Sequence, residues 1–140
     1  MLTRQDAVAF AQQWAADWNR LAIDTIVDHF APEGEMRSPL ATKFTGSSII
    51  KGRDAIRTYW HAAYGGLTEP RLTLASIAWD DELQRLTGWW SAPLPSGPTR
   101  ACEMMDFDAD HQIIAAKPIT APGARTAAGG TARALPHAFR

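Results

Sequence analysis

The stretch RACEMMDFD at residues 100–108 has the alternation of a β-strand with one buried face. Successive side chains of a strand point to opposite faces of its sheet. One face carries Ala101, Glu103, Met105 and Phe107, whereas the other carries the arginine and both aspartates. The first face is therefore predicted to lie against the core and to bring the Glu103 carboxyl with it. A shift of the strand register by one residue would instead place Glu103 in water.

A carboxyl group on an apolar face has to be paired, protonated or part of a cavity that uses it. Glu103 is therefore a candidate general acid or base, with a pKa raised above about 4.3 by the loss of hydration. The alternative is a structural acid that accepts a hydrogen bond from Trp14, Trp60 or Tyr59, and the two roles are compatible. Ionising Glu103 as the pH rises is expected to reduce the stability of the fold.

Four segments with strand-like alternation make up the second half of the chain. They cover residues 71–79, 83–92, 99–107 and 112–120. The connections between them are short enough for antiparallel hairpins. In the second segment Trp90 shares a face with Leu86 and Gly88, and the glycine is predicted to leave space beside the indole ring, as in the lining of a cavity.

Three helices are predicted before these strands. Apolar residues spaced by three and four positions place them over residues 3–19, 25–30 and 54–64. Thr3 and Asp24 are the predicted N-caps of the first two helices, and Gly52 precedes the third. Residues 32–34 are predicted to end the second helix, residues 35–39 to form a short strand, and residues 40–52 to form a loop. Helices on one face of a curved, mostly antiparallel sheet make an α+β fold.

The size of the chain, 140 residues, corresponds to one domain, which is predicted to cover residues 1–120. Residues 121–140 lack periodicity and are predicted to form a flexible basic tail. The alternative is a tail that docks over the pocket through Leu135 or Phe139. Without the three arginines of this tail, 11 basic and 15 acidic residues remain, a net charge of about −4. An acidic body argues against nucleic acid as a partner.

The composition also argues against metals and disulfides. Cys102 is the only cysteine, and the four histidines lack the spacing of metal ligands, so neither a metal nor another cofactor is expected. A reactive-thiol role for Cys102 is not predicted. His61, on the third predicted helix, is a candidate to reach the mouth of a pocket. The N-terminus resembles no signal peptide, and no apolar run reaches 18 residues, so a cytoplasmic protein without a membrane partner is expected.

The order of these elements and several short motifs resemble the NTF2-like superfamily, which includes ketosteroid isomerase and the SnoaL-like polyketide cyclases. The resemblance covers about residues 5–120. It is carried by Trp18-Asn19 followed by Asp24, by Phe30, by Arg37-Ser38-Pro39, by Gly52 before Ala55-Ile56-Arg57, and by Phe107-Asp108-Ala109-Asp110 followed by Gln112-Ile113.

This resemblance implies a cone in which the sheet wraps around a deep apolar pocket closed by the helices, the usual place for a small hydrophobic ligand. The residues predicted to line it are Phe10, Trp14, Trp18, Met36, Tyr59, Trp60, Trp90, Met105 and Phe107. Core packing is the alternative for the three aromatic residues of the first helix. The resemblance also implies a homodimer formed through the outer face of the sheet. Met104 and Trp89 support this independently, because that face would otherwise expose them.

The catalytic positions of ketosteroid isomerase carry over only in part. Ser38 stands where the isomerase has its proton-shuttling aspartate, and a serine hydroxyl cannot abstract an α-proton unaided, so steroid isomerisation by that mechanism is excluded. Trp14 stands in place of a hydrogen-bonding tyrosine and cannot ionise. Glu103 stands where the isomerase keeps a protonated aspartic acid. Glu103 and Ser38 are thus the candidate catalytic residues, although Ser38 has the alternative role of a capping hydroxyl before a proline.

Two functions of different classes fit these residues. The first is a cofactor-independent enzyme that uses acid–base chemistry on a hydrophobic cyclic or polyketide-like substrate, for isomerisation, cyclisation, dehydration or epoxide opening. The second is a ligand-binding module without catalysis, which the absence of an aspartate at Ser38 favours. The retained acid at Glu103 favours the enzyme, because a simple binder gains nothing evident from burying a carboxyl group. We prefer the enzyme on this ground.

Overall fold

The computed structural model describes residues 1–68, 70–94 and 97–119. The predicted tail, including the alternative in which it docks through Leu135 or Phe139, lies outside the described residues. In chain order the elements are α1 (Arg4–Asn19), α2 (Ile23–Val27), β1 (Phe30–Arg37), the 3-10 turn η1 (Pro39–Ala41), α3 (Thr42–Thr45), β2 (Ile49–Lys51), α4 (Arg53–Tyr64), β3 (Thr73–Asp80), β4 (Arg85–Leu94), β5 (Gly97–Phe107) and β6 (Ile113–Ile119).

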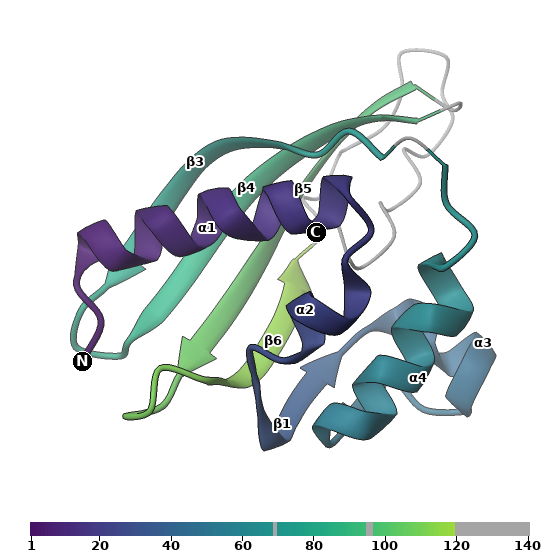
Figure 1. Cartoon of the computed structure of the whole chain (residues 1–140), viewed down its shortest axis with the longest axis horizontal. Coiled ribbons are helices and arrows are strands. Elements are labelled where there is room, and N and C mark those ends of the chain that lie inside the picture. Colours follow the sequence, from purple (N-terminus) through teal and green to yellow (C-terminus); the bar gives the residue numbers. More distant parts are fainter. Residues whose placement is uncertain (69, 95–96, 120–140) are drawn as a thin grey trace.

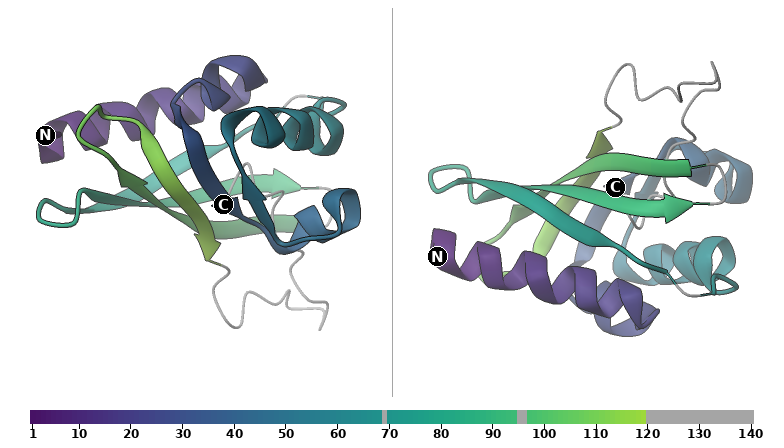
Figure 2. Two further views of the ribbon diagram at one scale, coloured as in Figure 1. Left: turned by 90° about the horizontal axis from the view of Figure 1, so that it is seen from below. Right: turned by 90° about the horizontal axis from the view of Figure 1, so that it is seen from above.

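The strands form one six-stranded sheet in the order β2-β1-β6-β5-β4-β3. Neighbouring strands are antiparallel except for β1 and β6, which are parallel. Helices α1, α2 and α4 lie on one side of the curved sheet (Figure 1). The views from below and above show the same helices over one face only, so the opposite face carries none of the described helices (Figure 2). The predicted α+β fold with a mostly antiparallel sheet is confirmed.

The predicted faces of the 100–108 strand are also confirmed. Ala101, Glu103, Met105 and Phe107 are each less than 5% exposed, and the strand pairs in one regular register with β4. Exposure is higher for Met104 and Asp106 on the opposite face. The register shift that would have placed Glu103 in water is therefore excluded.

Strand β1 is longer than the sequence predicts. Pro32 and Gly34 were expected to end a helix, but both lie inside the strand. A proline is tolerated here because the pairing of β1 with β6 is irregular between Phe30 and Glu35. Gly34 is required by a close approach, since a Cβ at this position would lie 2.8 Å from the Ile113 carbonyl oxygen. Both residues therefore mark an irregularity within the strand and not its boundary.

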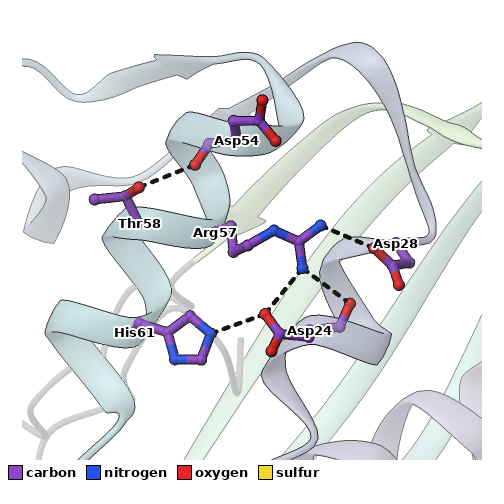
Figure 3. A network of polar contacts seen from close by, with 6 residues as sticks. All are labelled: Asp24, Asp28, Asp54, Arg57, Thr58 and His61. Carbon is purple, nitrogen blue, oxygen red and sulfur yellow. Dashed lines mark hydrogen bonds and ion pairs between the residues drawn. The ribbon is translucent and has the colours of Figure 1, made fainter.

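The predicted start of the second helix was wrong. Helix α2 begins one residue before Asp24, and its N-cap residue, Ala22, makes no side-chain cap bond. The Asp24 carboxylate instead accepts hydrogen bonds from Arg57 and His61 of α4, both at 2.9 Å (Figure 3). Arg57 also bonds Asp28, at 2.8 Å. These bonds tie α2 to α4. Asp24 therefore stabilises the contact between two helices and does not cap its own helix.

The predicted loop at residues 40–52 contains ordered elements that the sequence pattern does not reveal. It forms η1, α3 and β2, and β2 pairs with β1 so that Met36 lies opposite Ile50. Three residues are too few to show alternation, which explains why β2 was missed. Gly52, with φ of 95°, then begins α4 as predicted. At the other end of the chain, the predicted cap of α1 is confirmed by reciprocal bonds between Thr3 and Asp6.

The core between helices and sheet is built from aromatic rings. Trp60 of α4 is fully buried, with ring centroids 6.2 Å from Trp14, 5.2 Å from Trp18 and 5.5 Å from Phe30. All three contacts are edge-to-face, the arrangement that aromatic pairs favour. One ring of α4 thereby joins α1 and β1. Among the described helices, none has the length and apolar character needed to cross a membrane.

Candidate functional site

Glu103 lies at the centre of the inner face and is 1% exposed. It is paired across the sheet with Gly88 of β4 and Pro118 of β6. The indole Nε1 atoms of Trp14 and Trp60 form no hydrogen bond with any described residue. The structural role in which either tryptophan donates to the Glu103 carboxyl is therefore not realised.

Ser38 is completely buried at the end of β1, where it forms part of a chain of hydroxyl groups. Its Oγ lies 3.1 Å from the Tyr59 hydroxyl, which lies 3.4 Å from the Tyr64 hydroxyl. Ser38 is the N-cap residue of η1, but its side chain makes no cap bond, so the alternative role proposed for it was wrong. Tyr64 was missed in the sequence, although its position four residues after Trp60 continues the buried stripe of α4.

Glu103 and Ser38 lie in one row across the sheet. The parallel register pairs Met36 with Ala116, so Ser38, two residues further along, is level with Pro118. Pro118 is itself paired with Glu103. Two strand spacings separate the two candidate residues, which places their backbones about 10 Å apart. The inner face thus has a carboxyl group at one place and a group of hydroxyls at another, with the apolar ring of Pro118 between their strands.

The Trp90 ring fills the space over Gly88, which differs from the prediction. The glycine was expected to leave room beside the Trp90 ring, but the ring itself lies over the glycine, since a Cβ there would be 2.6 Å from Trp90 Cζ2 and 3.2 Å from Nε1. The predicted inner face of β4, with Leu86, Gly88 and Trp90 all buried, is confirmed. The glycine therefore accommodates the indole, and whether Trp90 also lines a cavity stays a prediction.

The other residues predicted to line a pocket are on the inner side of the molecule. Trp14, Trp18, Met36, Tyr59, Trp60 and Met105 are at most 1% exposed, Phe107 is 4% exposed, and Phe10 is half-buried. The Phe10 ring packs edge-on against Phe107 with centroids 5.0 Å apart, which joins α1 to β5. These contacts agree with the core packing proposed as the alternative for the rings of α1, and the ligand role stays a prediction.

Cys102 is buried on the outer face of the sheet, with 3% of its surface exposed. Burial raises the pKa of its thiol to about 11, and the negative charge of Glu103 on the neighbouring residue acts in the same direction. A thiol with this pKa stays protonated at neutral pH, so it is a poor nucleophile. Among the described residues, no group of three His, Cys, Asp or Glu side chains could hold a metal ion.

His61 is held at the surface and not in the interior. Its Nε2 faces Asp24 in the network between α2 and α4, and half of its side chain is exposed (Figure 3). The Arg57 guanidinium of this network lies between two carboxylates, which raises its pKa, and the hydrogen bonds from His61 and Arg57 lower the pKa of Asp24. The network thus fixes the position of α2 and supplies no group to the inner face.

His29 is the one histidine that packs among the aromatic residues of the described region. It is half-buried after α2, and its ring lies edge-on to Phe10 with centroids 5.0 Å apart. Burial lowers the pKa of His29, and the negative charges of Asp17 and Asp28 oppose that shift only in part. Asp17 is itself buried and accepts hydrogen bonds from Gln13 and Arg20.

Acid is therefore expected to destabilise the fold through His29. The unfolded chain takes up a proton near pH 6.5 more readily than the folded chain does, so this contribution to stability is present above pH 6.5 and is lost below it. His29→Phe keeps a ring against Phe10 and should flatten the fall in unfolding free energy between pH 7.5 and pH 5.5. Urea unfolding at three pH values measures this. Leu83→Ala, at an exposed position without a titratable group, should keep the wild-type slope, and an unchanged slope in His29→Phe would contradict the prediction.

A SnoaL-like domain matches residues 11–116. A SnoaL-like protein of unknown function from Burkholderia thailandensis superposes with a TM-score of 0.74 at 22% identity, covering 86% of this chain and 99% of that one. A protein of unknown function with a cystatin-like fold from Methylobium petroleophilum gives 0.66 at 19% identity, covering 87% and 82%.

A third solved structure has a described activity. The epoxide hydrolase/cyclase-like enzyme SalBIII, with a role in pyran ring formation in the polyether salinomycin, superposes with a TM-score of 0.65 at 15% identity, covering 87% of this chain and 95% of that one. Identities at this level show a shared fold alone. The chain matches no curated protein. The resemblance inferred from the sequence, and with it the NTF2-like fold, is confirmed.

Proposed function

Because the chain belongs to the SnoaL-like family, we propose that it is an enzyme that binds a small hydrophobic molecule against the inner face of its sheet and uses no cofactor. In this proposal Glu103 is the general acid or base. The observation that carries it is the burial of the Glu103 carboxyl, 1% exposed, on an inner face that is mostly apolar and aromatic. Burying a carboxyl group costs free energy, which a functional role explains.

The row across the sheet supports a substrate with two polar regions. Glu103 and Ser38 are two strand spacings apart, with β6 between their strands, and Tyr59 adds a second hydroxyl beside Ser38. A fused ring system about 10 Å long would contact both ends. We assign Ser38 to hydrogen bonding and not to nucleophilic attack, because the partner of its hydroxyl is the phenol of Tyr59, and a phenol does not act as a base at neutral pH.

The reaction class that fits one buried acid is proton transfer without a covalent intermediate. A protonated Glu103 would donate to a carbonyl or epoxide oxygen, and its carboxylate would take a proton back from the carbon or hydroxyl that reacts, so that the acid is regenerated. Isomerisation, cyclisation and epoxide opening all have this form. SalBIII, which shares the fold, is described as an epoxide hydrolase/cyclase-like enzyme, and this similarity supports the proposal.

Binding without catalysis is the second candidate function. It is favoured by the phenol beside Ser38, since in the described part of the chain Ser38 contacts no histidine or carboxylate that would activate it. Both functions require the same ligand site, and they differ only in whether Glu103 moves a proton. If the protein is only a binder, the wild type should bind the ligand but show no turnover.

A titration with bicyclic ketones tests the proposal. The core contains Trp14, Trp18, Trp60 and Trp90, so a ligand bound against the inner face should quench the intrinsic fluorescence. We expect saturable quenching by 1-tetralone or a larger fused-ring ketone, and proton exchange at the carbon beside the carbonyl in D2O, followed by NMR. Saturable binding without exchange or other turnover would favour the binding module. The absence of saturable binding across the panel would contradict both functions.

We also propose that the outer face of the sheet is the contact surface of a homodimer. It carries a hollow of about 240 Å³ over Met104 and Ala115, between the ion pair Glu35–Arg37 and the ion pair of Arg85 with Asp106. Trp89 on the same face is 41% exposed. A face with both signs of charge around an apolar centre is complementary to itself when a two-fold axis relates two copies.

Replacing Trp89 by Asp is expected to convert the dimer into a monomer. The carboxylate would be desolvated against the apolar centre of the partner's face, which disfavours association. Light scattering should give twice the 15.3 kDa chain mass for the wild type and 15.3 kDa for Trp89→Asp. Leu83→Asp changes a residue that is 56% exposed in the turn before β4 and should remain dimeric. A wild-type mass of 15.3 kDa would exclude the proposed dimer.

A further inference from the structure

Trp90 is a buried hydrogen-bond donor to which the described part of the fold gives no acceptor. Its side chain is 1% exposed, and its Nε1 atom forms no hydrogen bond with a described residue. An indole N–H can only donate. Native proteins leave few buried polar groups without a partner, so a buried donor of this kind calls for an explanation from its surroundings.

The position of this donor links it to Glu103. The Trp90 ring lies over Gly88, with Nε1 3.2 Å from the place where a Cβ of residue 88 would be. Gly88 is the residue directly opposite Glu103 on β5. Side chains that face each other in an antiparallel pair have Cβ positions about 5 Å apart. The indole nitrogen therefore occupies the cross-strand position beside the Glu103 side chain, on the same face.

We propose that Trp90 determines ligand specificity, by donating its indole N–H to an oxygen atom of the molecule that Glu103 acts on. This inference rests on the proposed function and names the ligand class more closely. The ligand is an apolar ring compound with an acceptor oxygen, a carbonyl, ether or epoxide, at the end that faces β4 and β5. A pure hydrocarbon would leave the donor unpaired, and an ammonium group would bring a second donor to it.

Other indoles of the interior do not share this position. Trp14 and Trp60 also have Nε1 atoms without a partner among the described residues, but their rings pack against each other across α1 and α4. Trp79 on β3 is a third case, and its ring packs beside Phe107 with centroids 6.3 Å apart. Trp90 differs because its ring fills the space that a side chain at Gly88 would occupy. This position lies beside Glu103.

The test compares two probes of nearly the same shape, 1-tetralone and its hydrocarbon counterpart tetralin. Trp90→Phe keeps a flat ring and removes the N–H. We expect the preference for the ketone, measured as the ratio of the two dissociation constants by fluorescence titration, to fall about 3- to 10-fold in Trp90→Phe, the range for one neutral hydrogen bond. Tetralin affinity should stay unchanged. Trp79→Phe removes an equally unpartnered indole N–H on β3 and should keep the wild-type ratio.

A second variant and a spectrum keep the test decisive. Gly88→Ala retains the indole but places a Cβ 2.6 Å from it, so the ring must shift and the ketone preference should fall as well. In the ¹H–¹⁵N spectrum of the wild type, one indole resonance should move downfield with 1-tetralone and not with tetralin. Equal affinity of the wild type for both probes, or an unchanged ratio in Trp90→Phe, would overturn the inference and leave the proposed function standing. Binding of neither probe, and of no larger fused-ring ketone, would overturn both.

Discussion

Replacing Glu103 by Gln should leave the melting temperature at pH 7 unchanged or higher while it abolishes turnover. Gln has the shape of Glu and no charge, so it removes the free-energy cost of ionising a group that is 1% exposed. It also removes the proton that the reaction needs, and loss of a general acid or base typically lowers the rate by about 10²- to 10⁴-fold.

The stability difference between Glu103→Gln and the wild type should depend on pH. If folding makes Glu103 harder to ionise, the folded chain binds its proton more tightly than the unfolded chain, and stability falls as the pH rises above about 4.3. The advantage of Glu103→Gln over the wild type should therefore grow from pH 4 to pH 7 in thermal melts. Glu33→Gln, at an exposed position of β1, should show no such trend and full turnover. A large destabilisation by Glu103→Gln would instead identify the carboxylate as a structural ion-pair partner.

Alternation along the strands was the part of the fold that the sequence predicted best. Residues 100–108 combine apolar and charged side chains in strict parity, and burial on one face enforces that parity, so the inner position of Glu103 followed from the pattern alone. Pro32 and Gly34 misled the prediction, because both residues usually interrupt strands. In β1 they sit where the pairing with β6 is irregular, and only the paired strand reveals that place.

The sequence named most residues of the candidate site, but it missed Tyr64 and did not reveal how the residues contact one another. The choice of Ser38 followed from the family resemblance, yet its contact with Tyr59 joins the end of β1 to α4, and no spacing along the chain encodes that contact. The position of the Trp90 ring over Gly88 depends on a side-chain rotamer, and the row from Ser38 to Glu103 depends on the registers of three strands. Both features depend on tertiary structure. Asp24 is a similar case, since its partners lie more than thirty residues away in α4.

Replacing Trp60 by Ala separates two roles for the aromatic cluster around it, a packed core and the wall of a ligand site. The Trp60 ring is fully buried against Trp14, Trp18 and Phe30. Removal of a tightly packed tryptophan is expected to cost about 3–5 kcal/mol, because the site loses transfer free energy and gains a cavity. For a domain of this size that corresponds to a fall in melting temperature of roughly 10–20 °C.

Urea unfolding and thermal melts of Trp60→Ala measure this loss, with Leu83→Ala as an exposed control expected to change stability by less than about 0.5 kcal/mol. A loss below about 1 kcal/mol would show that the ring borders existing space, so that little new cavity forms. The variant should then bind a larger fused-ring ketone more tightly than the wild type, and the ligand should raise its melting temperature. The full loss, without such rescue, assigns the ring to the core and confines the ligand to the sheet side, beside Glu103 and Trp90.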